Sequence, residues 1–140
     1  MGNIYYFDTS IWLDFLEDRN EPNLPKSTWA IELINKIILE ESKIILSDNN
    51  IIEFEVLGYS RYDIENLLDS LKSIIVSVES TPQQISRSKD LSEKRNVPKR
   101  DALHALIARD NKALLITLDA HFNKLMDIAM PHNPKEFIYA

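Results

Sequence analysis

Residues 99–122 read KRDALHALIARDNKALLITLDAHF, and the fold can be worked out from this stretch. It predicts a helix over residues 99–110, a short connection, and a buried strand over residues 113–117, because an apolar run follows the helical segment. Asp101 lies in the first turn of the helix, and Asp119 lies just beyond the strand. A carboxylate at each end of one helix–strand unit suggests that both face a shared pocket. The rest of the chain is expected to supply the other groups of that pocket.

The composition is typical of one folded domain. The chain has 140 residues, of which 44% are apolar and 27% charged, and this is enough for a core and a solvated surface. We therefore expect a single domain over residues 1–140. The apolar runs are too short to span a membrane, and Asp8 interrupts the first of them, which argues against a secretory signal. The absence of cysteine excludes disulfides and thiolate metal sites and is compatible with a cytoplasmic location.

Charge is distributed unevenly along the chain. The net charge of −6 argues on its own against binding to nucleic acid. Between residues 87 and 100, however, six bases face only two acids, and this run leads directly into Asp101. The run could hold the phosphates of RNA, although a solvated helix of mixed charge explains it equally well. The six candidate RNA-binding residues are Arg87, Lys89, Lys94, Arg95, Lys99 and Arg100.

Short apolar runs alternate with amphipathic segments along the chain. The runs predict strands over residues 3–7, 43–46, 74–78 and 113–117, and a fifth strand, at the sheet edge, over residues 136–139. The segments between them predict helices over residues 11–16, 28–42, 48–57, 63–73, 81–95, 99–110 and 121–128. This alternation predicts an α/β fold with a parallel sheet covered on both faces, a three-layer α/β/α sandwich. Ligands of such sheets bind beyond the carboxyl ends of the strands, where the strand order reverses.

Four acids can meet at that edge of the sheet. Asp8 follows the first strand, Glu53 lies two turns into the helix after the second strand, Asp101 opens the helix before the fourth strand, and Asp119 follows it. Four neighbouring carboxylates repel one another, so their pKa values rise or a cation enters between them. Oxygen ligands without cysteine or paired histidine favour Mg²⁺ or Mn²⁺. A divalent ion in such a site can activate a water against a phosphodiester, so the sequence predicts phosphodiester hydrolysis.

Four short motifs around these acids resemble those of a known family. Residues 4–10 (IYYFDTS) resemble an opening strand followed by Asp-Thr-Ser/Asn, and Ser47 followed by Glu53 resembles the second acidic motif. Residues 101–104 (DALH), with Ala108, resemble the third motif, and residues 115–122 (LITLDAHF) resemble the closing Thr-x-Asp-x-x-Phe motif. In this order, and over essentially the whole chain, the motifs resemble those of PIN-domain ribonucleases, and most closely those of the VapC toxins of type II toxin–antitoxin pairs.

The resemblance implies a PIN-like fold, whose five-stranded parallel sheet has the strand order 3-2-1-4-5. It also implies an endoribonuclease that depends on Mg²⁺ or Mn²⁺ and hydrolyses RNA. Asp8, Glu53, Asp101 and Asp119 would then be the catalytic, metal-coordinating residues. The implied protein partners are a cognate antitoxin and a second copy of the chain in a homodimer. The broad apolar helix over residues 28–42 is a candidate docking surface for the antitoxin.

Three side chains close to the motifs have two interpretations each. Ser10 and Thr117 could donate hydroxyl hydrogen bonds to the carboxylates, but capping and strand packing would also explain them. His104 lies one turn from Asp101 and could face it. For His104 we favour a structural role over a catalytic one.

The residues next to Glu53 and next to Asp119 are also candidate members of the site. Glu55 is expected at the surface, because on a helix its side chain points about 200° away from Glu53. Some PIN proteins carry a further acid shortly after the last one. This chain has Ala120, His121 and Asn123 there, which leaves the presence of a second metal ion open.

Two other classes of protein fit part of the pattern. A catalytically inactive PIN-like module would use the basic run over residues 87–100 to hold RNA, or would hold a protein, and metal binding distinguishes it from an enzyme. A phosphotransfer enzyme or receiver of another doubly wound type commonly shows Asp-x-Asp after the first strand, where this chain has Ser10. With only two glycines, the chain also has no glycine-rich loop for nucleotide phosphates.

Overall fold

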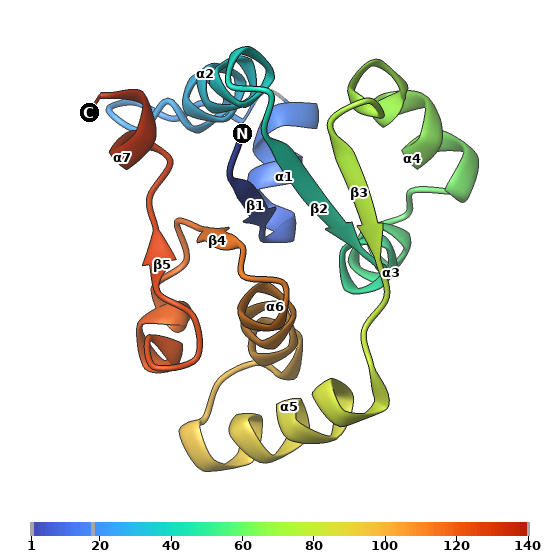
Figure 1. The fold of residues 1–140 in the computed structure, drawn as a ribbon, viewed down its shortest axis with the longest axis vertical. Helices are drawn as coiled ribbons and strands as arrows, with labels where there is room; N and C mark the ends of the chain where they lie inside the picture. Colours follow the sequence, from blue (N-terminus) through green and yellow to red (C-terminus); the bar gives the residue numbers. More distant parts are fainter. Residues whose placement is uncertain (1, 18, 140) are drawn as a thin grey trace.

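A five-stranded parallel sheet forms the centre of the computed structural model, which describes residues 2–17 and 19–139 (Figure 1). The strands are β1 (Ile4–Phe7), β2 (Lys43–Ser47), β3 (Ile75–Val78), β4 (Leu114–Ile116) and β5 (Pro131–His132). Their order is β3-β2-β1-β4-β5, and every neighbouring pair is parallel. The α/β class and the order 3-2-1-4-5 are therefore confirmed. The expected domain, residues 1–140, includes Met1, Asp18 and Ala140, which lie outside the described residues.

Strand β1 lies at the centre of the sheet and sends its side chains into two separate cores. Tyr5 and Phe7 pack on one face, and Tyr6 packs on the other. Tyr6 is in register with Ile45 of β2 and Leu115 of β4. Successive strand residues point to opposite faces, so a strand buried on both faces must be apolar at nearly every position. The sequence of β1 meets this requirement, and it therefore occupies the central place.

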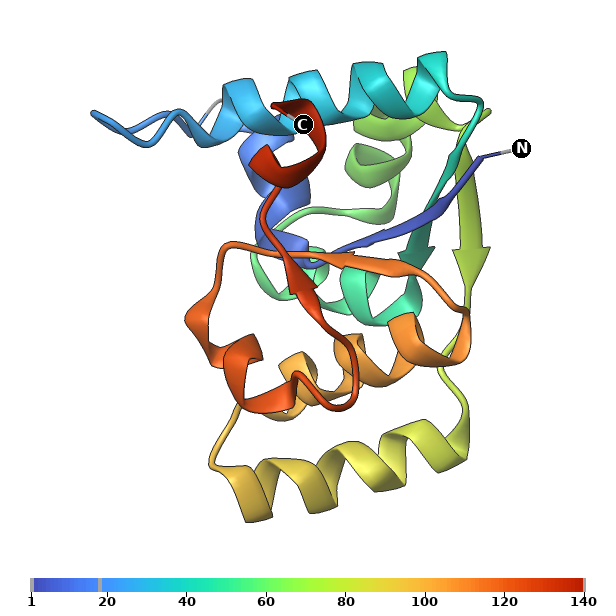
Figure 2. The same cartoon turned by 60° about the vertical axis from the view of Figure 1, so that its left-hand side comes forward.

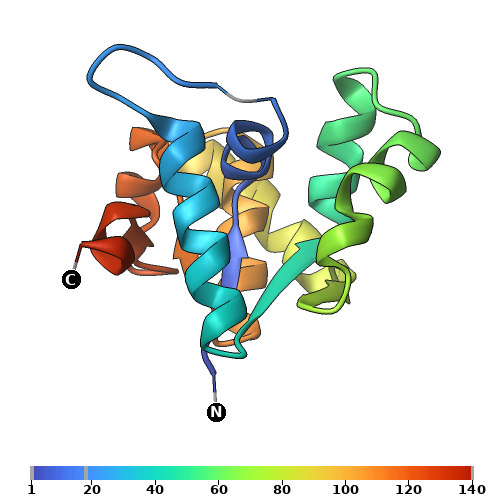
Figure 3. The ribbon, with the colours of Figure 1, turned by 90° about the horizontal axis from the view of Figure 1, so that it is seen from above.

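The first face of the sheet is covered mainly by the helices that follow the first two strands. These are α1 (Thr9–Leu16), α2 (Lys26–Leu39), α3 (Asp48–Val56) and α4 (Arg61–Leu68), joined by the C-terminal α7 (Lys135–Ile138). Figure 3 shows α2 lying over the middle of the sheet and α4 beside β3. The broad apolar stripe of α2 is explained by burial on two sides, because α2 packs on both α1 and α7. Only Ile31, Ile38 and Leu39 are large exposed apolar side chains on this helix.

The second face carries α5 (Pro82–Arg95), α6 (Lys99–Asp110) and the short 3₁₀ helix η2 (Ala120–Leu125). Figure 2 shows α6 against the sheet, with α5 outside it. Helix α6 is buried nearly all round, and its small residues Ala102, Ala105 and Ala108 let the sheet and α5 approach closely. None of the helices in the described part of the chain is both long and apolar enough to cross a membrane.

The C-terminal segment differs from the prediction. The fifth strand is Pro131–His132, where a loop was expected, and residues 135–138 form helix α7 instead of an edge strand. A strand of two residues leaves no periodic signal in the sequence, and proline is tolerated there because β5 is an edge strand. Helix α7 forms because Glu136 accepts a hydrogen bond from the backbone N–H of Asn133 (2.6 Å) and Phe137 packs edge-on against Tyr5.

Several predicted helices have different ends in the structure. The helix expected over residues 28–42 runs from Lys26 to Leu39. The helix expected over residues 63–73 begins earlier, at Arg61, and changes after Leu68 into the 3₁₀ helix η1 (Asp69–Leu71). The helix expected over residues 121–128 is the 3₁₀ helix η2. Helix ends often tighten in this way, and sequence periodicity does not report it.

The strand order reverses between β1 and β4. The chain runs from β1 to β2 and β3 on one side, and it later adds β4 and β5 on the other. Phe7 and Ile116 are paired at the carboxyl ends of these two neighbouring strands. Asp8 and Thr117 are the residues that follow directly. This is the position at which open α/β sheets bind ligands.

Candidate metal centre

Asp8 is the most deeply buried acid at the carboxyl edge of the sheet. It follows β1 and caps α1, since its Oδ1 accepts a hydrogen bond from the backbone N–H of Ile11 (3.1 Å). Its Oδ2 accepts a hydrogen bond from the hydroxyl of Thr117 (2.6 Å), which is the first of the two interpretations given for Thr117. Burial raises the pKa of Asp8 to about 6, and Asp101 adds to the rise, although Thr117 and His104 oppose it. Asp8 is thus held in one orientation in an environment that opposes its negative charge.

Asp101 and Asp119 approach Asp8 from the other side. Asp119 follows β4 and caps η2 by accepting a hydrogen bond from the backbone N–H of His121 (2.9 Å). Asp101 lies in the first turn of α6. Burial raises the pKa of Asp101 to about 6, followed by the charge of Asp119 and, more weakly, that of Glu53. The carboxylates are therefore close enough to repel one another.

Glu53 is held by two hydrogen-bond donors. It lies in the second turn of α3, and its Oε1 accepts hydrogen bonds from the hydroxyl of Thr9 (2.7 Å) and from Nε2 of His104. Burial alone would raise the pKa of Glu53, but the hydrogen bond and charge of His104, with the bond from Thr9, bring the pKa below its usual value. Glu53 is consequently ionised when Asp8 and Asp101 are still partly protonated.

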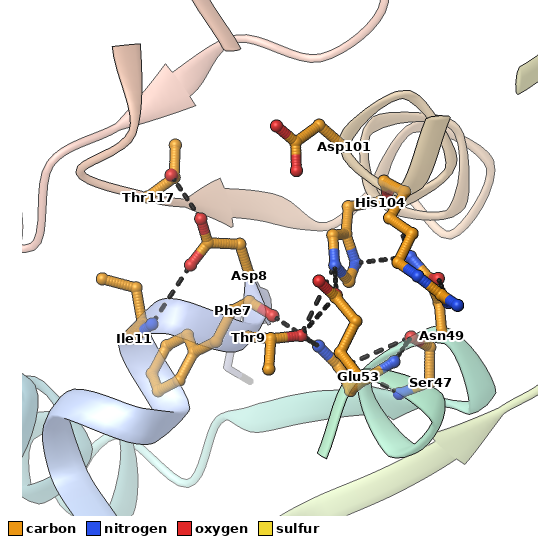
Figure 4. A network of polar contacts seen from close by, with 12 residues as sticks. Phe7, Asp8, Thr9, Ile11, Ser47, Asn49, Glu53, Asp101, His104 and Thr117 are labelled. Atoms are coloured by element: carbon orange, nitrogen blue, oxygen red, sulfur yellow. Dashed lines mark hydrogen bonds and ion pairs between the residues drawn. The ribbon is translucent and has the colours of Figure 1, made fainter. Parts of the chain in front are cut away.

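A buried polar network fixes His104 behind Glu53. Nδ1 of His104 lies 3.0 Å from Nδ2 of Asn49 (Figure 4). It also lies 2.5 Å from the hydroxyl of Tyr6, whose oxygen is 2.7 Å from Oγ of Ser47. An amide nitrogen can only donate, so Nδ1 accepts and Nε2 carries the hydrogen that points to Glu53. Figure 4 shows Asp101 opposite Asp8, with Glu53 and His104 beside them. His104 thus has the structural role that was favoured from the sequence, and this role is to orient Glu53, a carboxylate of the site.

Because of this network, the hydroxyl of Tyr6 should contribute more to stability than that of its neighbour Tyr5. We expect Tyr6→Phe to lower the free energy of unfolding by about 1–2 kcal/mol, because it leaves Ser47 and His104 with one partner fewer inside the core. Tyr5 points to the opposite face, and its hydroxyl donates to Glu40 at 3.3 Å, a longer hydrogen bond than those of Tyr6. Tyr5→Phe should therefore change stability by less than about 0.5 kcal/mol. Urea denaturation of the two variants measures the difference, and equal losses would contradict the network.

Thr9, not Ser10, supplies the hydroxyl of the first turn of α1. Ser10 is exposed and donates no hydrogen bond to a carboxylate in the described residues, whereas Thr9 is buried and bonds to Glu53. Successive helical residues are rotated by about 100°, so only one of the two can face α3. Sequence reasoning missed Thr9, and the packing of α1 against α3 was needed to choose it. Glu55 is exposed, as expected.

The six basic residues differ in their surroundings. Arg87, Lys89, Lys94 and Lys99 are exposed and form no ion pair among the described residues. Arg95 instead binds both carboxylate oxygens of Asp127, at 2.5 and 2.9 Å. Arg100 lies beside Asn49, 3.5 Å from its Oδ1, and helps to lower the pKa of Glu53. Four bases thus remain available to a ligand, while Arg95 ties α5 to the segment after η2.

The donor set fits a divalent cation. Oxygen atoms of Asp101 and Asp119 and a nitrogen of His121 lie within 4.8 Å of one another. Within residues 2–17 and 19–139, no lysine or arginine forms a salt bridge with Asp8, Glu53, Asp101 or Asp119. Asp8 and Asp101, whose pKa values are raised by burial and by neighbouring carboxylates, are groups whose charge a hard cation would stabilise. The residues present therefore fit Mg²⁺ or Mn²⁺.

Comparisons with known proteins agree with the fold and with the motifs. The PIN domain profile matches residues 5–127, and the chain belongs to the PIN domain family. A toxin–antitoxin complex from Klebsiella pneumoniae contains a chain of the same fold, with a TM-score of 0.65 and 17% identity over 93% of this chain and 97% of that one. VapBC2 from Rickettsia felis, bound to a DNA fragment from its promoter, gives a TM-score of 0.63 and 18% identity over 93% and 98%. No curated protein matches the sequence.

Proposed function

We propose that this protein is an endoribonuclease that depends on Mg²⁺ or Mn²⁺ and acts as the toxin of a type II toxin–antitoxin pair. The observation that carries the proposal is the group of acids at the switch point between β1 and β4, where Asp8, Glu53, Asp101 and Asp119 form no salt bridge to lysine or arginine among the described residues. Membership of the PIN domain family supports a nuclease. A module that only binds has no need of four mutually repelling carboxylates, whose repulsion lowers stability.

Each residue of the site has a distinct task in this proposal. A bound divalent ion supplies Lewis acidity, which activates a water and offsets charge on the scissile phosphate. Thr117 orients Asp8, and Thr9 and His104 orient Glu53. Because the pKa of Glu53 is lowered while that of Asp101 is raised to about 6, Glu53 offers a permanent negative charge and Asp101 gains most from a cation. The chain thus positions its oxygen donors before the ion binds.

The RNA backbone is the proposed ligand of the exposed bases on α5 and at the start of α6. Arg87, Lys89, Lys94 and Lys99 carry charges that are not neutralised by an ion pair in the described part of the chain. Phosphate contacts of this kind position a nucleic acid without reading its sequence. Arg100 follows Lys99 in the chain and is close enough to Glu53 to lower its pKa, which supports phosphate contacts near the acids.

An antitoxin is the proposed protein partner, as in the two complexes of similar fold. A groove of about 620 Å³ lies between α1 and the corner that joins α3 to α4. Its walls combine Leu13, Leu57 and Leu67 with two acids, Glu17 and Asp63, and one base, Arg19, which lies 4.0 Å from Glu17. This mixture suits a basic amphipathic segment of an antitoxin better than α2, most of whose apolar side chains are buried.

A homodimer and a cytoplasmic location complete the proposal. Val56, Leu57 and Tyr62 expose 73%, 59% and 72% of their surface at the end of α3 and the start of α4. Large apolar side chains that gather on one surface often mark a protein interface. A second copy of the chain is the proposed partner of the surface around Val56 and Tyr62. The cytoplasmic location follows from the proposed substrate, cellular RNA.

The test of the function compares two glutamates of the same helix. Purified protein with Mn²⁺ should cut a structured RNA, and EDTA should stop the reaction. Glu53→Gln is expected to reduce cleavage at least a hundredfold, because it removes a charged oxygen ligand but keeps an oxygen that can accept from Thr9 and His104. Glu55→Gln, two residues away and exposed, should leave cleavage unchanged.

Two results would contradict this function. If neither the wild type nor Glu55→Gln cuts RNA with any divalent metal, the chain is not a nuclease. Retention of RNA without heat from Mn²⁺ in calorimetry would then favour the inactive binding module. If Glu53→Gln and the wild type cut equally well, the acids do not form the catalytic site.

A further inference from the structure

His121 reaches into the pair formed by Asp101 and Asp119. Its Nδ1 lies 3.4 Å from Oδ2 of Asp101 and 3.3 Å from Oδ1 of Asp119. Two adjacent ligand atoms of an octahedral ion, each at about 2.1 Å, lie about 3.0 Å apart. The spacing around His121 is thus close to that of ligands around one ion, and closure by a few tenths of an ångström is within reach of an exposed side chain.

The local backbone holds His121 in this place. Asp119 accepts a hydrogen bond from the backbone N–H of His121 (2.9 Å), which closes the first turn of η2. The next residue, Phe122, is fully buried in the core beneath α6 and anchors the turn. The imidazole is 55% exposed, so solvent and a metal ion can reach it. Asp101 and Asp119 are its only ion-pair partners among the described residues.

We propose that His121 Nδ1 is a ligand of the bound cation and that this nitrogen makes the site prefer Mn²⁺ to Mg²⁺. This inference rests on the proposed function, because it concerns the ion of the same site. Mg²⁺ takes oxygen ligands almost exclusively, whereas imidazole suits transition metals, and affinity rises from Mn²⁺ towards Co²⁺ and Zn²⁺. A site built from carboxylates alone would distinguish these ions less.

The position of His121 beside Asp101 and Asp119 has a second explanation, which the experiment must distinguish from metal ligation. A protonated His121 could simply neutralise Asp101 and Asp119 as an ion pair. In that case the imidazolium would compete with a cation, and removal of His121 would tighten the binding of Mn²⁺ and Mg²⁺ alike. A nitrogen ligand instead predicts weaker binding of Mn²⁺ and a smaller preference over Mg²⁺.

The experiment measures the metal itself, independently of RNA cleavage. Isothermal titration calorimetry gives the dissociation constants of Mn²⁺ and Mg²⁺, and pulsed electron paramagnetic resonance detects ¹⁴N coupled to bound Mn²⁺. In the wild type we expect a ¹⁴N coupling and at least tenfold tighter binding of Mn²⁺. His121→Asp should keep Mn²⁺ bound through oxygen, abolish the coupling and reduce the preference at least fivefold.

A matched control uses the histidine near β5. His132 Nδ1 lies 3.3 Å from Glu136 Oε1, in an acid–histidine pair that contains none of the four acids. His132→Ala should keep both the coupling and the preference for Mn²⁺. His121→Ala should lose both, with an unchanged circular dichroism spectrum, since the side chain is exposed.

Three outcomes would overturn the inference. These are Mn²⁺ bound to the wild type without ¹⁴N coupling, a coupling that survives His121→Ala, or an unchanged preference in His121→Asp. If Mn²⁺ then still supports cleavage in the wild type and Glu55→Gln but not in Glu53→Gln, the proposed function stands and only the role of His121 fails. If the wild type neither binds Mn²⁺ nor cuts RNA, the proposed function fails first.

Discussion

Asp101→Asn is expected to abolish RNA cleavage and, at the same time, to make the metal-free protein more stable. Cleavage should fall roughly a thousandfold, which corresponds to about 4 kcal/mol of lost transition-state stabilisation. The charge of Asp101 is the one most affected by its neighbours, since burial and then Asp119 raise its pKa to about 6. Without a cation, that charge is a source of repulsion. The same carboxylate therefore serves the reaction and weakens the fold.

The gain in stability can be bounded. The side chain of Asp101 is 15% exposed, and solvent screens part of the repulsion, so we expect about 1 kcal/mol at pH 7.5 rather than the full value of the pKa shift. For a chain of this size, 1 kcal/mol corresponds to a rise of about 3 °C in melting temperature. Differential scanning calorimetry in EDTA measures this rise. An RNA cleavage assay with Mn²⁺ measures the loss of activity.

Asp110 provides the control on the same helix. It lies at the exposed end of α6, where Gln84 donates a hydrogen bond to it (2.9 Å), and its pKa is lowered rather than raised. Asp110→Asn should cut RNA like the wild type. A variant Asp101→Asn that is inactive but less stable than the wild type in EDTA would mean that the carboxylates do not repel one another, and the argument for a cation site would lose its physical basis.

The metal-free protein should become less stable as the pH rises from 5 to 7.5, and Mn²⁺ should abolish this trend. The pKa values of Asp8 and Asp101 are about 6 in the folded chain, above the ordinary value of 3.8. Between these values the folded chain binds more protons than the unfolded chain, so stability is present at low pH and is lost as the pH passes through 6. Glu53 has the opposite shift, and its contribution is lost only at lower pH, outside this window.

The size of the effect follows from the same shifts. One carboxyl whose pKa moves from 3.8 to about 6 accounts for about 1.4 kcal/mol between pH 7.5 and pH 5. With Asp101 reduced for solvent screening, we expect about 2 kcal/mol in total. Urea denaturation at pH 5, 6 and 7.5, with EDTA or with Mn²⁺, gives both curves. Saturating Mn²⁺ should stabilise the protein at pH 7.5 and have little effect at pH 5, where protons compete for the same oxygens.

Two comparisons make this expectation refutable. Asp101→Asn in EDTA should retain a smaller dependence on pH, since only Asp8 still titrates with a raised pKa. A stability that rises with pH in EDTA, or an Mn²⁺ effect that is equal at pH 5 and pH 7.5, would show that Asp8 and Asp101 are not the groups that the cation relieves.

Some parts of the fold were predictable because they depend on local chemistry. The strands β1 and β4 are unbroken apolar runs and β2 has an apolar centre over residues 44–46, while α5 begins where Thr81 and Gln84 cap each other's backbone N–H. Strand β5 and helix α7 were not predictable in the same way. A strand of two residues is too short to show a periodic pattern. The segment 135–138 becomes a helix because Phe137 packs against Tyr5, which is more than a hundred residues away in the sequence.

The same distinction applies to the site: the acids could be predicted from the sequence, and the residues that hold them could not. Asp8, Glu53, Asp101 and Asp119 could be chosen from their places relative to strands and helix starts. Their partners could not be predicted in this way. The choice of Thr9 over Ser10 depends on which elements pack together, and so does the link from Tyr6 through His104 to Glu53. The same is true of the ion pair between Arg95 and Asp127. Geometry also brought His121 to Asp101, since η2 turns back towards α6.

The sequence by itself determined the order of strands and helices as far as β4, the family and the candidate acids, because these follow from apolar periodicity, capping and motifs within a few residues of one another. Only the tertiary structure decided which side chains hold those acids and which of them carries a raised or a lowered pKa. The physical reason is that hydrogen bonds and desolvation act over a few ångströms, and residues separated by up to 109 positions come within that distance only after the sheet has formed.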